Sequence, residues 1–268
     1  MDMFVILSGI ATGFVLGLLG SGGSIIALPA LIYLLGVAPK AALAMSLGVV
    51  GVTATLAAVN HGRRGNVDAP VALAFALFGV AGTYVGTRVG VATPAVVQLT
   101  LFALVMYTAA WRMLRRPSAK PQSAPALNFN VSGGAAALGG CPEVFSPCMV
   151  KIALAAVGVG LLTGLVGVGG GFLIVPALVL FSGLPMKKAV GTSLAIVAAN
   201  AYAGFYGYLG TVPVDWPLMG GFVSMTLLGS LLGTWASSRL SHETLKSAFG
   251  AFLILVASYI LIKNGLFA

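Results

Sequence analysis

Long runs of apolar residues, separated by short polar segments, divide the whole chain. The runs cover residues 3–36, 41–60, 69–91 and 95–114, and then 152–183, 189–209, 216–237 and 244–263. An α-helix needs about 20 apolar residues to cross the ~30 Å hydrocarbon core of a bilayer. The pattern therefore predicts an all-α, polytopic membrane protein.

The first run of each set is too long for one crossing. A straight helix over 3–36 would reach roughly 50 Å, which exceeds the thickness of the core. A glycine cluster near its middle gives the backbone the freedom to reverse sharply. We therefore predict a helical hairpin, either fully spanning or re-entrant, and a second one over 152–183.

The two glycine clusters belong to an internal repeat. Residues 17–31 read GLLGSGGSIIALPAL and residues 164–178 read GLVGVGGGFLIVPAL, with eight identical positions at a spacing of 147. The match continues at the same spacing, for example from Asp68 to Asp215. A duplicated helix-breaking motif in apolar sequence is typical of the binding site between the two repeats of a secondary transporter.

Each repeat should contain one glycine-broken hairpin and three further transmembrane helices. The first repeat spans 1–113 and the second spans 151–268. Between them, residues 114–150 are rich in Pro, Ser, Ala and Gly, which favours a connecting loop outside the membrane. Cys141 and Cys148 fall in this loop, and the sequence assigns them no role. The N-terminal run lacks a basic n-region and contains the first repeat motif, so we expect it to be mature protein.

Composition supports the membrane assignment. Hydrophobic residues make up 59% of the chain and charged residues 7%, and the mean hydropathy is +1.06. A soluble domain carries roughly a quarter charged residues. The 14 basic residues against 5 acidic ones lie in the breaks between apolar runs, so we read them as determinants of orientation and not as a nucleic-acid surface.

The distribution of basic residues distinguishes two topologies. If each first run returns to its starting side, the repeats are inverted and the 14 basic residues divide 3 against 11 between the two sides. If each first run crosses once, the repeats are parallel and the division is 6 against 8. The positive-inside rule prefers the first arrangement. We therefore expect two inverted repeats, with both termini outside and the central loop in the cytoplasm.

The hairpin tips are the candidate substrate site. A helix that restarts after a glycine cluster presents unpaired backbone N–H groups and a positive dipole end, which suits an anion. Hydroxyl and amide side chains in the neighbouring spans can add hydrogen-bond donors. The candidate binding residues are Gly20, Ser21, Gly22, Gly23, Ser24, Ser46, Gly167, Gly169, Gly170, Gly171, Thr192, Ser193 and Asn200.

Several of these features also have structural explanations. Glycines often permit close helix packing, which we prefer for seven others: Gly9, Gly13, Gly79, Gly82, Gly86, Gly229 and Gly233. Helix Ser and Thr often bond back to their own carbonyls. Asp68 and Asp215 precede apolar helices and are expected to be N-caps. Pro29 and Pro176 should kink the second arm of each hairpin.

No acidic or basic residue lies securely in the middle of a span, so the sequence shows no intramembrane proton relay. We expect no catalytic residue, no cofactor and no metal site. The coupling ion and the direction of transport stay open, as does homo-oligomerisation, since packing glycines serve contacts within and between chains. The alternatives are a transporter of a different anion and an intramembrane serine enzyme using Ser21.

The doubled motif G-L-x-G-x-G-G-x(5)-P-A-L, the segment AVGTSL at 189–194 and the Val-Asp pairs before the following spans resemble the TauE/SafE family of sulfite exporters and anion permeases. The resemblance covers nearly the whole chain apart from 114–150. It implies a bacterial inner-membrane transporter of sulfur-containing oxyanions such as sulfite or organosulfonates. The first copy departs from the pattern, with AMSL at 44–47 in place of GTSL.

Overall fold

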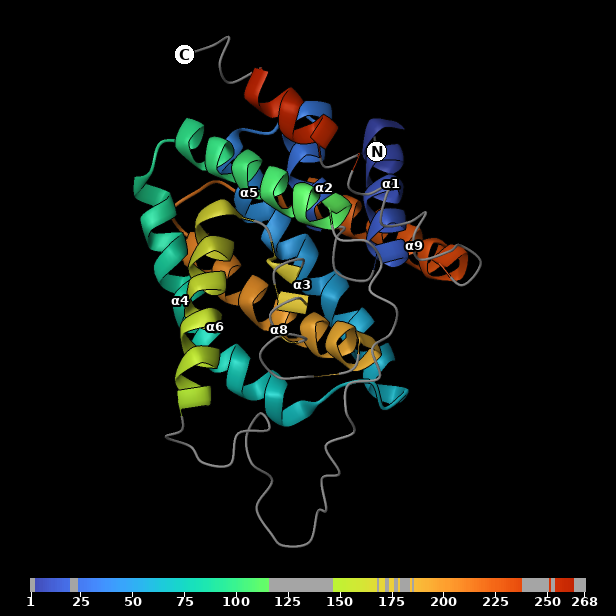
Figure 1. Cartoon of the computed structure of the whole chain (residues 1–268). Coiled ribbons are helices and arrows are strands. Elements are labelled where there is room, and N and C mark those ends of the chain that lie inside the picture. The colour runs from blue at the N-terminus through green and yellow to red at the C-terminus, as the bar shows by residue number, and fades with distance from the viewer. Residues whose placement is uncertain are drawn as a thin grey trace, which may run out of the picture.

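The computed structural model describes residues 3–19, 24–115, 147–167, 169–171, 174–175, 178, 184, 186–237, 251 and 254–262. Every regular element in these residues is helical (Figure 1). The elements are α1 (Met3–Leu19), α2 (Ser24–Pro29), the π-helix η1 (Ala30–Leu34), α3 (Pro39–Arg63), α4 (Ala69–Ala92), α5 (Ala95–Arg115), α6 (Pro147–Val166), α8 (Met186–Tyr208) and α9 (Trp216–Ser237). The prediction of an all-α protein is confirmed.

The expected reversal of the first apolar run is present, because α1 packs against the π-helix η1 that follows in the same run. Helix α1 ends at Leu19, and a separate helix, α2, begins at Ser24. Pro29 is the last residue of α2, and the backbone then continues as a π-helix. Proline removes one hydrogen bond from the helical ladder, which accounts for the wider turn that follows it. The prediction for Pro176 lies outside the described residues.

The helices reach slightly into the segment that we expected to be a loop. Helix α5 continues to Arg115 and α6 already begins at Pro147, whereas the connection was predicted over 114–150. Arginine and leucine are good helix formers, so the end of an apolar run does not end a helix. Proline suits the first position of a helix, where its missing N–H costs no hydrogen bond.

Helices α3 and α8 cross antiparallel at the centre of the molecule (Figure 1). They begin 147 positions apart, at Pro39 and Met186, and are therefore equivalent in the repeat. Leu47 lies beside Gly204, whereas His61, further along α3, lies beside Gly191. Residue numbers thus rise along one helix as they fall along the other.

The outer helices pair across the two repeats. Helix α1 packs against α9, and α4 packs against α6 (Figure 1). At the spacing of 147, α6 is the repeat equivalent of α1, and α9 is the repeat equivalent of α4. Both pairs are parallel: along α1 and α9, Gly9 meets Phe222 and Gly13 meets Thr226. Each repeat therefore completes its packing with the first helix of the other repeat.

Glycines make these pairs close, as predicted. A Cβ added at Gly82 would strike the backbone of Val157, and one added at Gly229 would strike the backbone of Ile10. The other predicted packing positions with a close neighbour across a helix interface are Gly9, Gly13, Gly79 and Gly86, and Gly233 is buried. Without a hydrophobic driving force between helices in lipid, such close backbone contact is a main source of their association.

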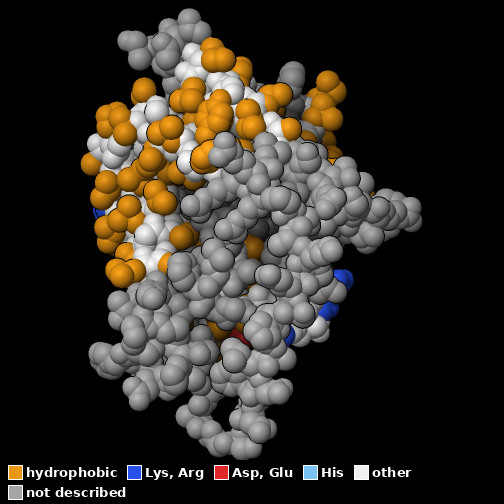
Figure 2. Space-filling model, viewed as in Figure 1, with side chains coloured by type: hydrophobic (Ala, Val, Ile, Leu, Met, Phe, Trp, Pro, Cys, Tyr) orange, Lys and Arg blue, Asp and Glu red, His pale blue; other side chains and the backbone are white. Residues whose placement is uncertain are grey.

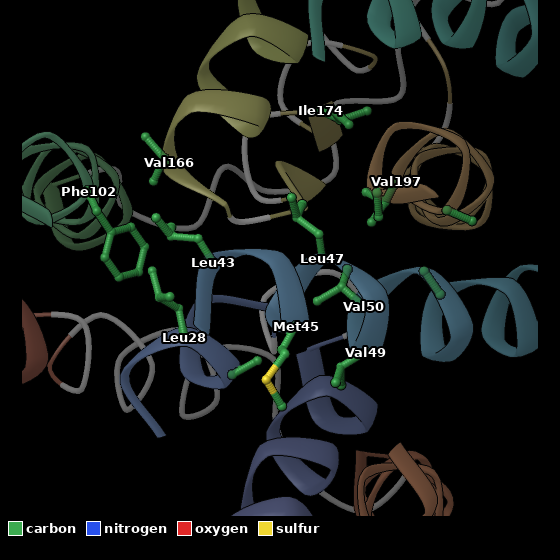
Figure 3. Packing of buried hydrophobic residues seen from close by; sticks show 14 of the residues in the cluster. Leu28, Leu43, Met45, Leu47, Val49, Val50, Phe102, Val166, Ile174 and Val197 are labelled. Carbon is green, nitrogen blue, oxygen red and sulfur yellow. The ribbon is translucent and has the colours of Figure 1, made fainter. Parts of the chain in front are cut away.

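The core gathers around α3. Leu43 of this helix points toward Leu28 of α2, Phe102 of α5 and Val166 of α6, and all four side chains are buried (Figure 3). On the next turns of α3, Leu47 and Val50 face the side of the core that carries Val197 of α8 (Figure 3). Helix α3 is therefore enclosed by elements of both repeats.

The outward surface is apolar. Figure 2 shows mostly hydrophobic side chains on the described part of the visible face. Leu73 and Leu77 of α4, for example, are each 69% exposed. Four helices are long and apolar enough to cross a membrane: Pro39–Arg63, Ala69–Ala92, Lys188–Tyr208 and Trp216–Gly233. A surface of this kind suits lipid, and the chain is a polytopic α-helical membrane protein.

Candidate substrate site at the second glycine break

The second glycine break lies in the core, between the two central helices. Helix α6 ends at Val166, and Gly167 and Gly170 then take left-handed backbone angles, with φ of 70° and 65°. These angles favour glycine, because a Cβ would clash with the backbone. Gly169 sits between Val50 of α3 and Val197 of α8, and a Cβ added to it would lie 3.0 Å from the Val197 Cγ1.

Two further glycines of the break are enclosed as tightly. A Cβ at Gly167 would strike Leu43 of α3, and one at Gly170 would strike the Thr163 hydroxyl on α6. Gly171 is buried as well, and the Ile174 N–H donates to the Gly170 carbonyl at 3.1 Å, as in a new helical turn. The break is thus surrounded by protein, as irregular backbone within a membrane must be.

Side chains from both repeats satisfy the carbonyl groups at the end of α6. The Ser46 hydroxyl donates to the Gly167 carbonyl at 2.5 Å. The Gln98 Nε2 donates to the Leu165 carbonyl at 3.0 Å, and the Tyr208 hydroxyl donates to the Gly164 carbonyl at 3.2 Å. The last carbonyls of a helix have no partners within it, so these three donors stabilise the point at which α6 stops.

Gln98 and Tyr208 were not among the sequence-predicted residues. Gln98 of α5 is 1% exposed, and its Nε2 also donates to the Gly90 carbonyl at 2.9 Å. The sequence could have pointed to Gln98, because a glutamine inside the apolar run 95–114 needs a hydrogen-bond partner in the membrane. Tyrosine is common at membrane interfaces, so Tyr208 gave no comparable signal. Thr163, which lies beside Gly170, was not predicted either, because nothing in the sequence distinguishes it from other helix threonines.

The predicted hydroxyl residues have different surroundings. Ser46 reaches the second break, as described above. Ser193, its repeat equivalent, donates to the Val190 carbonyl of its own helix at 2.8 Å. Thr192 lies at the α3–α4 connection, where its hydroxyl accepts a hydrogen bond from the Asp68 N–H at 2.9 Å. Of these three residues, only Ser46 has a described contact with the glycine break.

Asn200 is buried near the break without a partner. Its side chain is 0% exposed, and neither the amide nitrogen nor the amide oxygen has a hydrogen-bond partner among the described residues. The residue lies one turn along α8 from Val197, which contacts Gly169. Buried polar groups nearly always have a partner, so this amide calls for a functional explanation.

The first glycine break is only partly described. Gly20, Ser21, Gly22 and Gly23 lie outside the described residues, and Ser24 is the first residue of α2. Cys141 also lies outside them, and the side chain of Cys148 is not described.

The two aspartates are helix caps, as predicted. The Asp68 carboxylate accepts the Val71 N–H at 3.2 Å, and the Asp215 carboxylate accepts the Leu218 N–H at 3.0 Å. Each satisfies a backbone donor in the first turn of its helix. Among the described residues, no three His, Cys, Asp or Glu side chains gather as metal ligands.

Long apolar helices, cross-paired repeats and a buried helix break define a membrane protein with an internal polar site of the kind found in secondary transporters. The comparisons with known proteins agree. The family model "Sulfite exporter TauE/SafE" matches residues 5–260, and the chain belongs to this family. It is therefore a membrane transporter of the TauE/SafE family.

Similar proteins carry matching descriptions. A "Probable membrane transporter protein" of Xylella fastidiosa (strain Temecula1) is 34% identical over 260 residues, which is 96% of this chain and 94% of that protein. The "Probable membrane transporter protein YunE" of Bacillus subtilis (strain 168) is 28% identical over 281 residues, 99% of each chain. No solved structure matches this chain.

Proposed function

We propose that the chain transports small sulfur-containing oxyanions, such as sulfite or organosulfonates, by alternating access. The substrate binds between the two glycine breaks near the middle of the bilayer. The observation that carries this proposal is the second break, which is held in the protein core beside Val197, one helical turn from the Asn200 amide that has no partner among the described residues. The family match supports the sulfur-containing substrate class.

The site suits an anion through neutral groups. Glycine lets an oxyanion approach the backbone N–H groups closely, and a helix that begins there adds a positive dipole end. Among the described residues, no Lys or Arg is buried. An anion held by dipoles alone remains easy to release, which a transporter requires at the end of each cycle.

The helix directions support inverted repeats. Helices α3 and α8 occupy equivalent positions in the two repeats and cross antiparallel. Repeats of the same orientation would send both helices across the membrane in the same direction. With the distribution of basic residues, this favours repeats over 1–113 and 151–268, both termini outside, the connecting loop in the cytoplasm and a bacterial inner membrane as the location.

Two alternatives remain for comparison. A transporter of a different anion would use the same site, because backbone donors recognise charge and size more than chemical identity. A serine enzyme would need a base within hydrogen-bond reach of Ser21. Hydrolytic activity that is lost in Ser21→Ala would favour the enzyme.

The proposal is tested by anion flux into proteoliposomes, measured over sulfite, sulfoacetate, thiosulfate, sulfate and taurine. With folding intact, Gly22→Leu and Gly170→Leu are expected to lower flux at least tenfold, because a side chain at either tip keeps an anion from approaching the backbone N–H groups. Gly158→Leu is the control, since Gly158 of α6 is exposed with open space around it. Unchanged flux in both tip variants contradicts the site, and absence of flux for every anion contradicts the function.

A further inference from the structure

The amide of Asn200 offers two kinds of hydrogen bond. Its nitrogen is a donor and its oxygen is an acceptor, and both are buried without a partner among the described residues. Because both atoms are unpartnered, this holds whichever way the amide is turned. A ligand that satisfies the whole side chain must therefore bring an acceptor and a donor.

The protein keeps room for this amide. A Cβ added at Gly79 of α4 would lie 2.7 Å from the Asn200 Oδ1 and 2.9 Å from its Nδ2. Any larger residue at position 79 would press on the amide. Val197, one helical turn before Asn200 on α8, lies beside Gly169 of the glycine break together with Val50 of α3. The amide is thus about one helical turn from the break, and two valines flank the break itself.

The equivalent position of the first repeat carries a different side chain. The residue 147 positions before Asn200 is Thr53, which is also buried. Its hydroxyl has its hydrogen bonds within its own helix, to the Val49 carbonyl at 2.8 Å and the Val50 carbonyl at 3.2 Å. The equivalent positions on α3 and α8 therefore differ in chemistry.

We propose that Asn200 binds the end of the substrate opposite its oxyanion, and that the substrate is an organosulfonate whose far end carries a hydroxyl group, which is both a donor and an acceptor. This inference rests on the proposed function. The oxyanion lies at the glycine break, a short apolar link lies against the two valines, and the donor reaches the amide oxygen. Sulfate is disfavoured, because it brings only acceptors and leaves the amide oxygen without a donor.

The test uses two ligands that differ in one group. Flux of 2-hydroxyethanesulfonate and of ethanesulfonate is measured with the full chain in proteoliposomes. The wild-type protein is expected to prefer the hydroxyl compound about tenfold to a hundredfold, since a lost hydrogen bond leaves the buried oxygen unpaired. In Asn200→Leu, which is similar in shape and apolar, the ratio should fall to about one while ethanesulfonate flux persists.

Two further variants keep the outcome clear. Thr53→Val is the matched control in the first repeat and should leave the ratio unchanged. Asn200→Thr copies the residue of the first repeat and replaces Asn200→Leu if the latter does not fold. A wild-type ratio near one, or a ratio that survives either Asn200 variant, overturns the inference while sulfonate flux upholds the proposed function. Absence of flux for every anion overturns both.

Discussion

The α4–α6 pair and the α1–α9 pair share their glycine contacts but differ in what adjoins them. In α4, Gly79 makes room for the amide of Asn200. The equivalent residue of α9 is Thr226, which is buried and bonded to the Phe222 carbonyl of its own helix at 2.7 Å. The glycine packing is thus common to both pairs, whereas the unpartnered amide adjoins the α4–α6 pair.

The two repeats also differ in the residues that would hold the end of the first helix of each hairpin, which is α1 in the first repeat and α6 in the second. Gln98 and Tyr208 hold the last carbonyls of α6. The residue 147 positions after Gln98 is Leu245, and the residue 147 positions before Tyr208 is His61. A duplicated sequence can therefore keep its glycine packing while side chains from both repeats collect at one of the two helix breaks. Three predictions test this comparison, in order of expected effect.

The largest effect should come from the shared glycine contacts. Gly160→Ala and Gly229→Ala should each lower stability by about 1–3 kcal/mol, because the added methyl meets the backbone of a neighbouring helix. Thermal unfolding of the purified protein measures this. Gly158→Ala on α6 and Gly220→Ala on α9 are matched controls, since nothing lies within 4 Å of the added Cβ. If variants and controls melt at the same temperature, the close glycine contacts do not stabilise the two helix pairs.

A smaller effect is expected where the halves differ. Gln98→Leu should cost about 1–2 kcal/mol, because the part-buried Leu165 carbonyl loses its described side-chain donor. Tyr208→Phe should cost about 1 kcal/mol through the Gly164 carbonyl. Hydrogen exchange should rise at the second glycine break in both variants. Exchange that rises equally at the first break would mean that the two halves are held in the same way.

The smallest effect concerns two neighbouring hydroxyls of α8. Thr192→Val should cost about 1 kcal/mol, because the Asp68 N–H loses its acceptor across the repeats. Ser193→Ala should stay within about 0.5 kcal/mol, since its hydroxyl bonds only to its own helix among the described residues. Thermal unfolding compares the two variants. A loss of flux in Ser193→Ala with unchanged melting would instead assign this hydroxyl to the substrate.

Much of the fold was predictable from the sequence. Run lengths located the helices because a bilayer fixes how many apolar residues a crossing needs. The same length argument required the breaks that appear after Leu19 and Val166. The aspartate caps followed from the local rule that an N-cap precedes its helix. Each of these features depends on neighbours in sequence.

The site was predictable only in part. Glycine clusters marked the break, and an amide within an apolar helix marked Asn200. The partners of Ser46 and Thr192 were not predictable, because each hydroxyl meets a residue more than 100 positions away. Gln98 became part of the site only through the crossing of α5 over the end of α6.

By itself, the sequence determined the membrane class, the repeat, the helix breaks and the family resemblance, since composition, run length and motif spacing are properties of the chain alone. Only the tertiary structure decided which helices pair across the repeats, which side chains hold the second glycine break and that both polar atoms of Asn200 lack a partner among the described residues. Those outcomes depend on distances between residues remote in sequence, and packing fixes such distances. The glycine motif therefore showed where the backbone must break, and the fold around α3 and α8 showed which chemistry meets the break.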